Sequence, residues 1–141
     1  MRVRKNANRD IPVMIETWND TQSEGGAWSG KEMYDANTGD DFFTSLTYCG
    51  VAVDFGGNIH GFYALNKKND TEAEALFVVR KASRNQKVGQ DLMNDCLKVA
   101  KDKGFVQIIL EDVKDENEIA KHVFEKAGFE KCGDTTYKKS L

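Results

Sequence analysis

The sequence predicts an α/β domain in which helices cover a mixed β-sheet. Its 141 residues are the usual size of one domain, so we expect residues 1–141 to form a single folded unit. In the first half, two apolar strands flank the turn Phe55-Gly56-Gly57. In the second half, apolar runs and helical stripes alternate in the order strand, helix, strand, helix, strand. Such alternation is typical of a layered α/β architecture.

The first part of the chain predicts one short strand followed by helices. Residues Arg2 to Lys5 favour a strand. The run Asp10-Ile11-Pro12 is typical of a helix start, because Asp caps a helix and Pro fits its first turn. The stretch from Thr21 to Gly30 is polar and rich in glycine, which predicts a loop. Residues Lys31 to Leu46 predict one or two short helices.

The next segments predict three strands and a helix. Strands are expected at Thr47 to Asp54 and at Asn58 to Asn66, joined by the glycine turn, because glycine tolerates a positive φ. A third strand is expected at Glu74 to Val79. A helix follows and ends near Lys103-Gly104. Its apolar stripe consists of Val88, Leu92, Cys96, Val99 and Ala100.

The C-terminal part predicts a central strand, a helix and a closing hairpin. Residues Val106 to Leu110 form a continuous apolar run, which suits the centre of a sheet. A helical stripe covers Asn117 to Ala127 and ends at Gly128. We expect the hairpin to comprise Phe129 to Cys132 and Thr135 to Lys139.

Composition and charge argue against several classes of function. Lys and Arg number 20 against 23 Asp and Glu, a net charge of -3, and a nucleic-acid binder normally needs a basic face. No apolar run reaches the roughly 18 residues that cross a bilayer, and no apolar region follows the basic N-terminus. We therefore expect no membrane association. The 3 cysteines form no CxxC pair, which predicts no metal site and fits a reducing cytoplasm.

The turn between the strand at Glu74 to Val79 and the helix near Val88 is a candidate anion site. A strand-to-helix junction presents free backbone N–H groups at the positive end of a helix dipole. Gly89 allows a ligand to approach the backbone, and Arg84 and Lys87 add positive charge. The alternative interpretation is an ordinary turn with solvated basic residues.

Two segments carry a resemblance to a known family. Leu76-Phe77-Val78-Val79 and the run from Arg84 to Met93 resemble motif A of the Gcn5-related N-acetyltransferase (GNAT) superfamily. Arg84 matches the first position of that motif and Gly89 the last, whereas Lys87 stands where a glycine is expected. Downstream, Asn117-x-x-Ala120 and the run from Phe124 to Phe129 are similar to the superfamily's segment Asn-x-x-Ala-x-x-x-Tyr-Glu-Lys-x-Gly-Phe.

The resemblance implies a GNAT-like fold and an acyl-CoA cofactor. The fold would have a mixed, mostly antiparallel sheet of about six or seven strands flanked by about four helices. The cofactor would be acetyl-CoA or another acyl-CoA, and in the family the helix that carries Asn117 and Phe124 flanks its pantetheine arm. The implied cofactor-binding residues are Phe77, Val78, Val79, Arg84, Asn85, Gln86, Lys87, Val88, Gly89, Gln90, Asn117 and Phe124.

The resemblance further implies transfer of an acetyl group from acetyl-CoA to an amine by direct attack. The acceptor would be a small molecule or a protein amino group. The alternative is a catalytically degenerate domain that only binds, which the departures Lys87 and Phe124 favour. Aromatic residues could line an acceptor pocket, form a homodimer contact or fill the core. They are Trp18, Trp28, Tyr34, Phe42 and Phe43.

The catalytic residues remain open at the level of sequence. Phe124 stands where the family usually has its acid, a tyrosine, so Tyr137 or Tyr63 could supply a hydroxyl from elsewhere, and so could water. The candidate bases are carboxylates at strand ends, where burial raises a pKa, and one histidine. These candidates are Glu72, Glu74, Glu111, Asp112 and His60. A solvated charge or a half-buried strand aromatic is the alternative at each position.

Overall fold

The computed structural model describes residues 1–24, 28, 31–84, 87–114 and 118–141. Within these ranges it contains seven strands, which are β1 (Arg2–Lys5), β2 (Tyr48–Val53), β3 (Ile59–Lys67), β4 (Glu72–Val79), β5 (Gln107–Leu110), β6 (Glu130–Lys131) and β7 (Tyr137–Ser140). The α-helices are α1 (Ile11–Glu24), α2 (Ala36–Ser45), α3 (Val88–Asp102) and α4 (Glu118–Lys126). Two short 3-10 helices, η1 (Asn8–Asp10) and η2 (Lys81–Ser83), precede α1 and α3.

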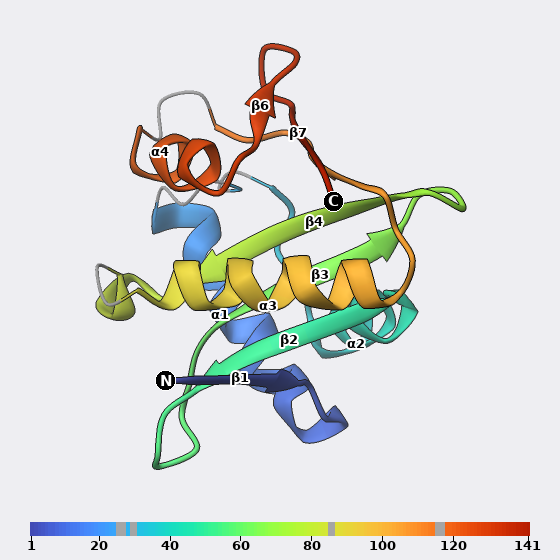
Figure 1. The fold of residues 1–141 in the computed structure, drawn as a ribbon. Helices are drawn as coiled ribbons and strands as arrows, with labels where there is room; N and C mark the ends of the chain where they lie inside the picture. The colour runs from blue at the N-terminus through green and yellow to red at the C-terminus, as the bar shows by residue number, and fades with distance from the viewer. Residues whose placement is uncertain (25–27, 29–30, 85–86, 115–117) are drawn as a thin grey trace.

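The strands form one sheet in the order β1-β2-β3-β4-β5-β7-β6. Every neighbouring pair is antiparallel except β4 and β5, which are parallel. Helix α3 lies in front of the sheet in Figure 1, and α1 and α2 lie behind it. The expected mixed, mostly antiparallel sheet with helices around it is therefore confirmed. None of the described helices is both long and apolar enough to cross a bilayer.

The parallel pair β4–β5 is short. Its register joins Glu72 to Gln107 and continues only as far as Glu74 opposite Ile109. Strand β4 runs on to Val79, but no described residue of β5 pairs with this second half. The two strands therefore diverge, and one edge of β4 is open beyond Glu74.

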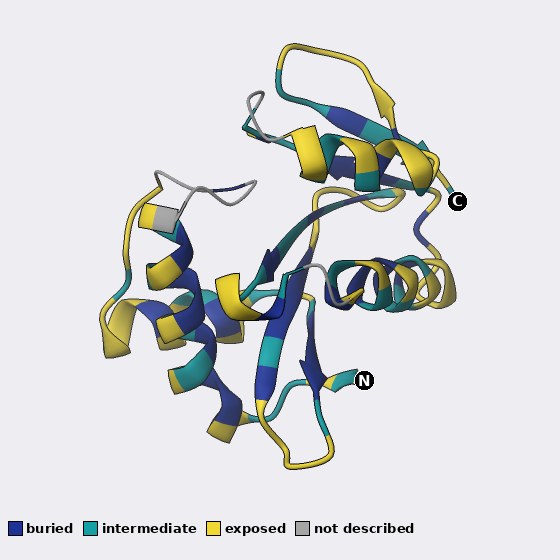
Figure 2. Ribbon diagram, turned by 90° about the vertical axis from the view of Figure 1, so that its left-hand side faces the viewer, coloured by how far each residue is buried: buried dark blue, intermediate teal, exposed yellow. Residues whose placement is uncertain are grey.

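The core lies on both faces of the sheet and is centred on β2, β3 and β5, most of whose residues are buried (Figure 2). On the face behind β3, the ring of Phe62 meets Phe43 of α2 at 5.3 Å between centroids. On the front face, the hydroxyl of the neighbouring residue Tyr63 donates to Asp95 of α3 at 2.7 Å. Successive residues of β3 thus face opposite layers, as the pleat of a strand requires.

The expected loop from Thr21 to Gly30 is wrong over its first residues, because α1 continues to Glu24. The polar side chains of this last turn bond to helix carbonyls instead of leaving the helix. Thr21 Oγ1 donates to the carbonyl of Trp18 at 2.8 Å, and Ser23 Oγ donates to that of Asp20 at 3.2 Å. A polar composition therefore hid a helical turn.

The helix starts also differ in detail from the sequence-based expectation. Asp10 immediately precedes α1, but its carboxylate accepts a hydrogen bond from the backbone N–H of Ala7 at 2.6 Å and pairs with Arg4. The segment Lys31 to Leu46 forms one described helix, α2. Its cap is Asp35, which accepts a hydrogen bond from the N–H of Thr38 at 2.8 Å.

Candidate cofactor and acyl-transfer site

The junction between β4 and α3 is an anion-binding geometry. Helix α3 begins at Val88, and its own hydrogen-bond ladder begins with the N–H of Asp91, which donates to the carbonyl of Lys87 at 3.0 Å. The N–H groups of Val88, Gly89 and Gln90 consequently have no partner within the helix. They lie at the positive end of a helix dipole, where an anionic ligand is stabilised.

Lys87 adopts the left-handed backbone conformation, with φ 64° and ψ 12°. This is the position where motif A places a glycine, and glycine reaches that conformation without strain. A lysine there costs about 1 kcal/mol. The departure from the motif therefore lowers folding stability and adds an ammonium group beside the helix start.

Gly89 is not required by the packing of the protein itself. Among the described residues, a Cβ built at this position would meet only the Val79 Cγ2 atom, at 3.8 Å, which is ordinary van der Waals contact. Its φ also lies outside the left-handed region. The missing side chain therefore leaves space on the ligand side of the helix start.

Cationic side chains surround this junction. Arg84 Nε donates to the carbonyl of Val79 at 3.4 Å, which holds the guanidinium against the end of β4.

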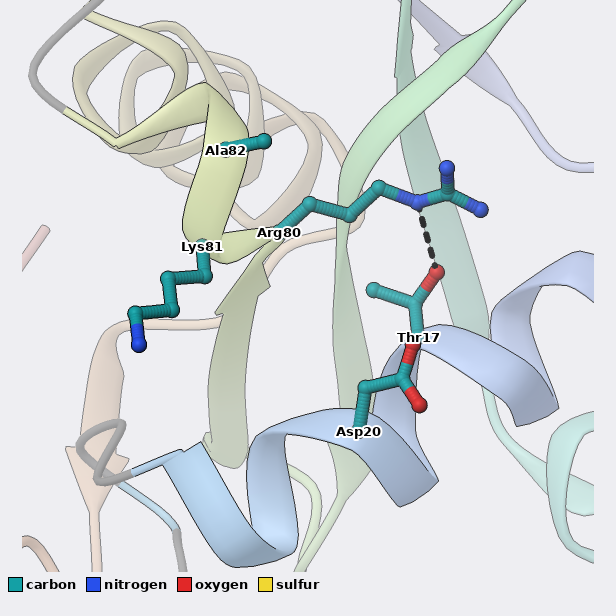
Figure 3. A pocket seen from close by; sticks show the side chains of 5 residues that line it. All are labelled: Thr17, Asp20, Arg80, Lys81 and Ala82. Atoms are coloured by element: carbon teal, nitrogen blue, oxygen red, sulfur yellow. Dashed lines mark hydrogen bonds between the residues drawn. The ribbon is translucent and has the colours of Figure 1, made fainter.

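On the α1 side, a surface pocket of about 410 Å³ is lined by Thr17, Asp20, Arg80, Lys81 and Ala82. Figure 3 shows Arg80 extended toward Thr17, to which its Nε donates at 3.3 Å, whereas Lys81 extends in another direction.

The open edge of β4 can bind an extended chain that carries amides. The N–H of Lys68 donates to the carbonyl of Glu72, and the N–H of Arg80 donates to that of His60, each at 2.9 Å. In an antiparallel ladder, alternate residues direct their N–H and C=O groups to the same neighbour. By this alternation, the N–H and C=O groups of Phe77 and Val79 point away from β3. They point to the side of β4 on which the pairing with β5 has already ended.

Aromatic side chains gather where β4 and β5 diverge. Phe124 of α4 is 3% exposed, and its ring centroid lies 6.3 Å from that of Phe77 and 5.9 Å from that of Tyr137. Trp28, from the segment between α1 and α2, joins the group at 5.7 Å from Phe124. Phe124 thus packs against side chains of β4 and β7 close to the point where β4 and β5 diverge.

Two of the candidate bases converge on one lysine. Lys68 Nζ lies 2.6 Å from Glu111 Oε1 and 3.4 Å from Glu74 Oε1, so a carboxylate from each of the diverging strands meets the same cation. The hydrogen bond that Lys68 donates to Glu111 is the main cause that raises the pKa of Lys68. Glu72 lies apart, accepting a hydrogen bond from Asn69 Nδ2 at 2.9 Å.

The remaining acidic and basic candidates have other partners. Asp112 Oδ2 pairs with Lys31 Nζ at 3.1 Å. His60 lies in a chain of hydrogen bonds, with Nδ1 at 2.7 Å from Ser83 Oγ and Nε2 at 2.8 Å from Asp54 Oδ2. Ser83 is 4% exposed, so this chain ties the β2–β3 turn to η2 and presents no accessible nucleophile.

The two candidate tyrosines differ in their partners. The hydroxyl of Tyr63 is occupied by Asp95, and burial together with this contact raises the pKa of the phenol well above its ordinary range. The hydroxyl of Tyr137 is buried, and no described residue accepts or donates a hydrogen bond to it. A buried hydroxyl without a partner costs about 1–3 kcal/mol, so Tyr137, unlike Tyr63, carries a hydroxyl that no described residue satisfies.

Some expected residues lie outside the described part of the chain, and two residues make contacts at the site that were not predicted. Asn85, Gln86 and Asn117 are outside the described residues. Trp28 and Lys68 were not singled out for these contacts, because each reaches the site across a long sequence separation. Trp28 Nε1 donates to the carbonyl of Glu111 at 2.7 Å across 83 residues, and local patterns carry no signal of such a contact.

The fold is shared with solved acetyltransferases. The chain superposes on the ribosomal-protein-alanine N-acetyltransferase from Brucella melitensis with a TM-score of 0.86 at 16% identity, covering 100% of both chains. For a GCN5-related N-acetyltransferase from Kribbella flavida the TM-score is 0.88 at 20% identity, covering 99% of this chain and 97% of that one. For a GNAT superfamily phosphinothricin acetyltransferase from Sinorhizobium meliloti, solved in complex with AcCoA, the TM-score is 0.85 at 17% identity, covering 99% and 88%.

Sequence comparison assigns the family independently of these structures. A search of curated proteins found no matching relative. The family profile described as "Acetyltransferase (GNAT) family" matches residues 13–129, which include both segments that resemble the family and most of the sheet. The chain therefore belongs to the GNAT acetyltransferase family.

Proposed function

We propose that this protein transfers an acetyl group from acetyl-CoA to the nitrogen of an amine. The observation that carries the proposal is the continuity between the helix start at Val88 and the open edge of β4. A pyrophosphate at the free N–H groups of Val88 to Gln90 would leave the attached pantetheine arm beside Phe77 and Val79. Its amides can bond there as an additional strand bonds to a sheet edge.

The cofactor class fits this chain at two points. Gly89 provides space at the helix start, where a Cβ would have no contact in the protein closer than 3.8 Å. The second half of β4 offers backbone donors and acceptors that β5 does not use. A ligand with a diphosphate at one end and two amides in an extended arm matches both features.

The chemical step requires one base and one acid. The neutral amine attacks the thioester carbon, the carbon–sulfur bond breaks, and the acetyl group remains on nitrogen. The carboxylate of Glu111, at the end of β5 beside Glu74, is the proposed acceptor of the ammonium proton. Tyr137 is the proposed donor to the leaving thiolate, in place of the tyrosine that Phe124 replaces. Close placement of the two substrates supplies much of the rate.

Acetyl-CoA binding and thiol release test the proposal separately. Calorimetry should give saturable binding of acetyl-CoA, and a panel of amines, including peptides with free N-termini, should contain acceptors that cause thiol release. Binding without release across the panel would support the alternative, a GNAT fold that is kept only for binding. No binding at millimolar acetyl-CoA would overturn both the cofactor assignment and the enzyme.

A further inference from the structure

The indole of Trp28 fills the gap between the diverging strands. It is 5% exposed, and its N–H donates to the carbonyl of Glu111, the residue that follows β5. Its ring centroid lies 6.3 Å from that of Phe77 on β4 and 5.7 Å from that of Phe124 on α4. One side chain therefore contacts both strands of the parallel pair beyond the point where they separate.

The contacts of the indole join elements on opposite faces of the sheet. Phe77 is paired with Tyr63, whose hydroxyl reaches Asp95 of α3, so both rings lie on the α3 face. Helices α1 and α2, which flank Trp28 in the sequence, lie behind the sheet in Figure 1. The contacts with Phe77 and with the Glu111 carbonyl place the indole where β4 and β5 diverge.

We propose that Trp28 limits the length of the acyl group that the protein accepts. This inference rests on the proposed function, in which the pantetheine arm follows the edge of β4 at Val79 and Phe77. Its thioester then arrives at the indole, whose position is fixed by a hydrogen bond and by two aromatic neighbours. An acetyl group ends beside the ring. A longer chain must displace the ring and break its bond to Glu111.

The test compares affinities for CoA, acetyl-CoA, butanoyl-CoA and octanoyl-CoA by calorimetry. The native protein should bind acetyl-CoA at least about tenfold more tightly than octanoyl-CoA, since a filled pocket discriminates by this factor for even one methylene. In Trp28→Leu this ratio should fall to about one or reverse, and in Trp28→Phe it should lie between the two. Affinity for CoA without an acyl group should stay unchanged in every variant.

Trp18→Leu is the matched control. Trp18 is 2% exposed, and its N–H donates to the carbonyl of Glu32 at 2.8 Å, so this variant also removes one buried indole and one hydrogen bond to a carbonyl. Its ring stacks on Tyr34, away from the gap, and the native chain-length ratio should persist. Two results would overturn the inference. One is an unchanged ratio of acetyl-CoA to octanoyl-CoA affinity in both Trp28 variants. The other is a fall of this ratio in Trp18→Leu as large as that in Trp28→Leu.

A second measurement keeps Trp28 in place, so it tests the inference even if the Trp28 variants do not fold. The chain has 2 tryptophans, so in Trp18→Phe the only indole emission comes from Trp28. Acetyl-CoA should change that emission, whereas CoA should change it much less, because only the acyl group reaches the ring. Equal responses would contradict the inference while leaving acetyl-CoA binding established. If the native protein binds no acyl-CoA, the proposed function fails first.

Discussion

Arg4 and Asp10 are joined by two parallel hydrogen bonds, from Nη1 to Oδ2 at 2.8 Å and from Nη2 to Oδ1 at 3.1 Å. The same carboxylate accepts the N–H of Ala7, and Asp10 is 5% exposed. This pair fastens β1 to the start of α1. The hydrogen bond from Arg4 is the main cause that lowers the pKa of Asp10 below its ordinary value of 3.8.

The lowered pKa of Asp10 predicts acid sensitivity. The ionised carboxylate is stabilised in the folded chain, so its contribution is fully present above the unfolded pKa near 3.8 and is lost as pH falls through the folded pKa. Asp10→Asn should cost about 2 kcal/mol at pH 7. It should also flatten the pH dependence of the urea midpoint below about pH 4.

The exposed residue Asp134 supplies the control for this measurement, since Asp134→Asn should leave both the midpoint and its pH dependence unchanged. If Asp10→Asn retained the full acid dependence of the native protein, the pair with Arg4 would not be the group responsible.

The sequence predicted most helices and strands, but it did not predict side-chain contacts between elements, such as that of Arg4 with Asp10. Periodicity predicted the elements, because an apolar stripe marks a helix such as α3 and a continuous apolar run marks β5. It failed at the end of α1, where Thr21 and Ser23 bond to helix carbonyls and so make a polar segment helical. Asp10 was expected as a cap, yet its main partner is a side chain of another element.

At the candidate site, too, the secondary-structure elements were predicted and the long-range contacts were not. The strand and the helix start on either side of the proposed cofactor loop were predictable, because a continuous apolar run and an apolar stripe mark them. Trp28 and Lys68 were not, because their contacts with Glu111 span 83 and 43 residues. Such contacts depend on where strands diverge in space, and a local pattern contains no measure of that divergence.

Lys87 gives a second prediction, because its left-handed backbone favours glycine. Lys87→Gly should raise the free energy of unfolding by about 0.5–1 kcal/mol, since strain is removed at some cost in chain entropy. Acetyl-CoA should still bind, because the N–H groups of α3 stay in place. Thermal unfolding with and without ligand measures both effects.

Lys87→Ala separates charge from backbone conformation. It retains a side chain at φ 64° and removes the ammonium group. We expect no gain in stability and a drop in acetyl-CoA affinity of about threefold at low salt, which added salt should diminish. If Lys87→Ala stabilised the protein as much as Lys87→Gly, the left-handed conformation would not be the source of the strain.

Gly89 and Gly104 predict opposite outcomes for the same substitution. Gly89→Ala places a Cβ on the ligand side of the helix start with ordinary contact to Val79, so stability should hold while acetyl-CoA affinity falls about tenfold or more. Gly104 has φ +88° at the end of α3, so Gly104→Ala should cost about 1 kcal/mol and leave affinity unchanged. Native-like binding by Gly89→Ala would refute the loop assignment.

The carboxylates near Lys68 yield a prediction for the base. Glu111 follows the last residue of β5, whereas Glu72 lies at the start of β4 and accepts a hydrogen bond from Asn69. With an accepted amine, Glu111→Gln should lower kcat about a hundredfold, and Glu72→Gln should change it less than about twofold. An unchanged kcat in Glu111→Gln would exclude Glu111 as the base.

The substitution Tyr137→Phe should lower the rate of transfer without lowering stability. Its buried hydroxyl has no partner among the described residues, so Tyr137→Phe should leave stability unchanged or raise it by about 1 kcal/mol. If that hydroxyl protonates the leaving thiolate, kcat should fall about a hundredfold while acetyl-CoA affinity holds. Tyr63→Phe should lower stability and leave kcat unchanged. It removes the hydroxyl that donates to Asp95 at 2.7 Å, so the carboxylate loses a hydrogen-bond partner. Full activity in Tyr137→Phe, measured as thiol release at saturating amine, would remove Tyr137 from the mechanism and leave water as the acid.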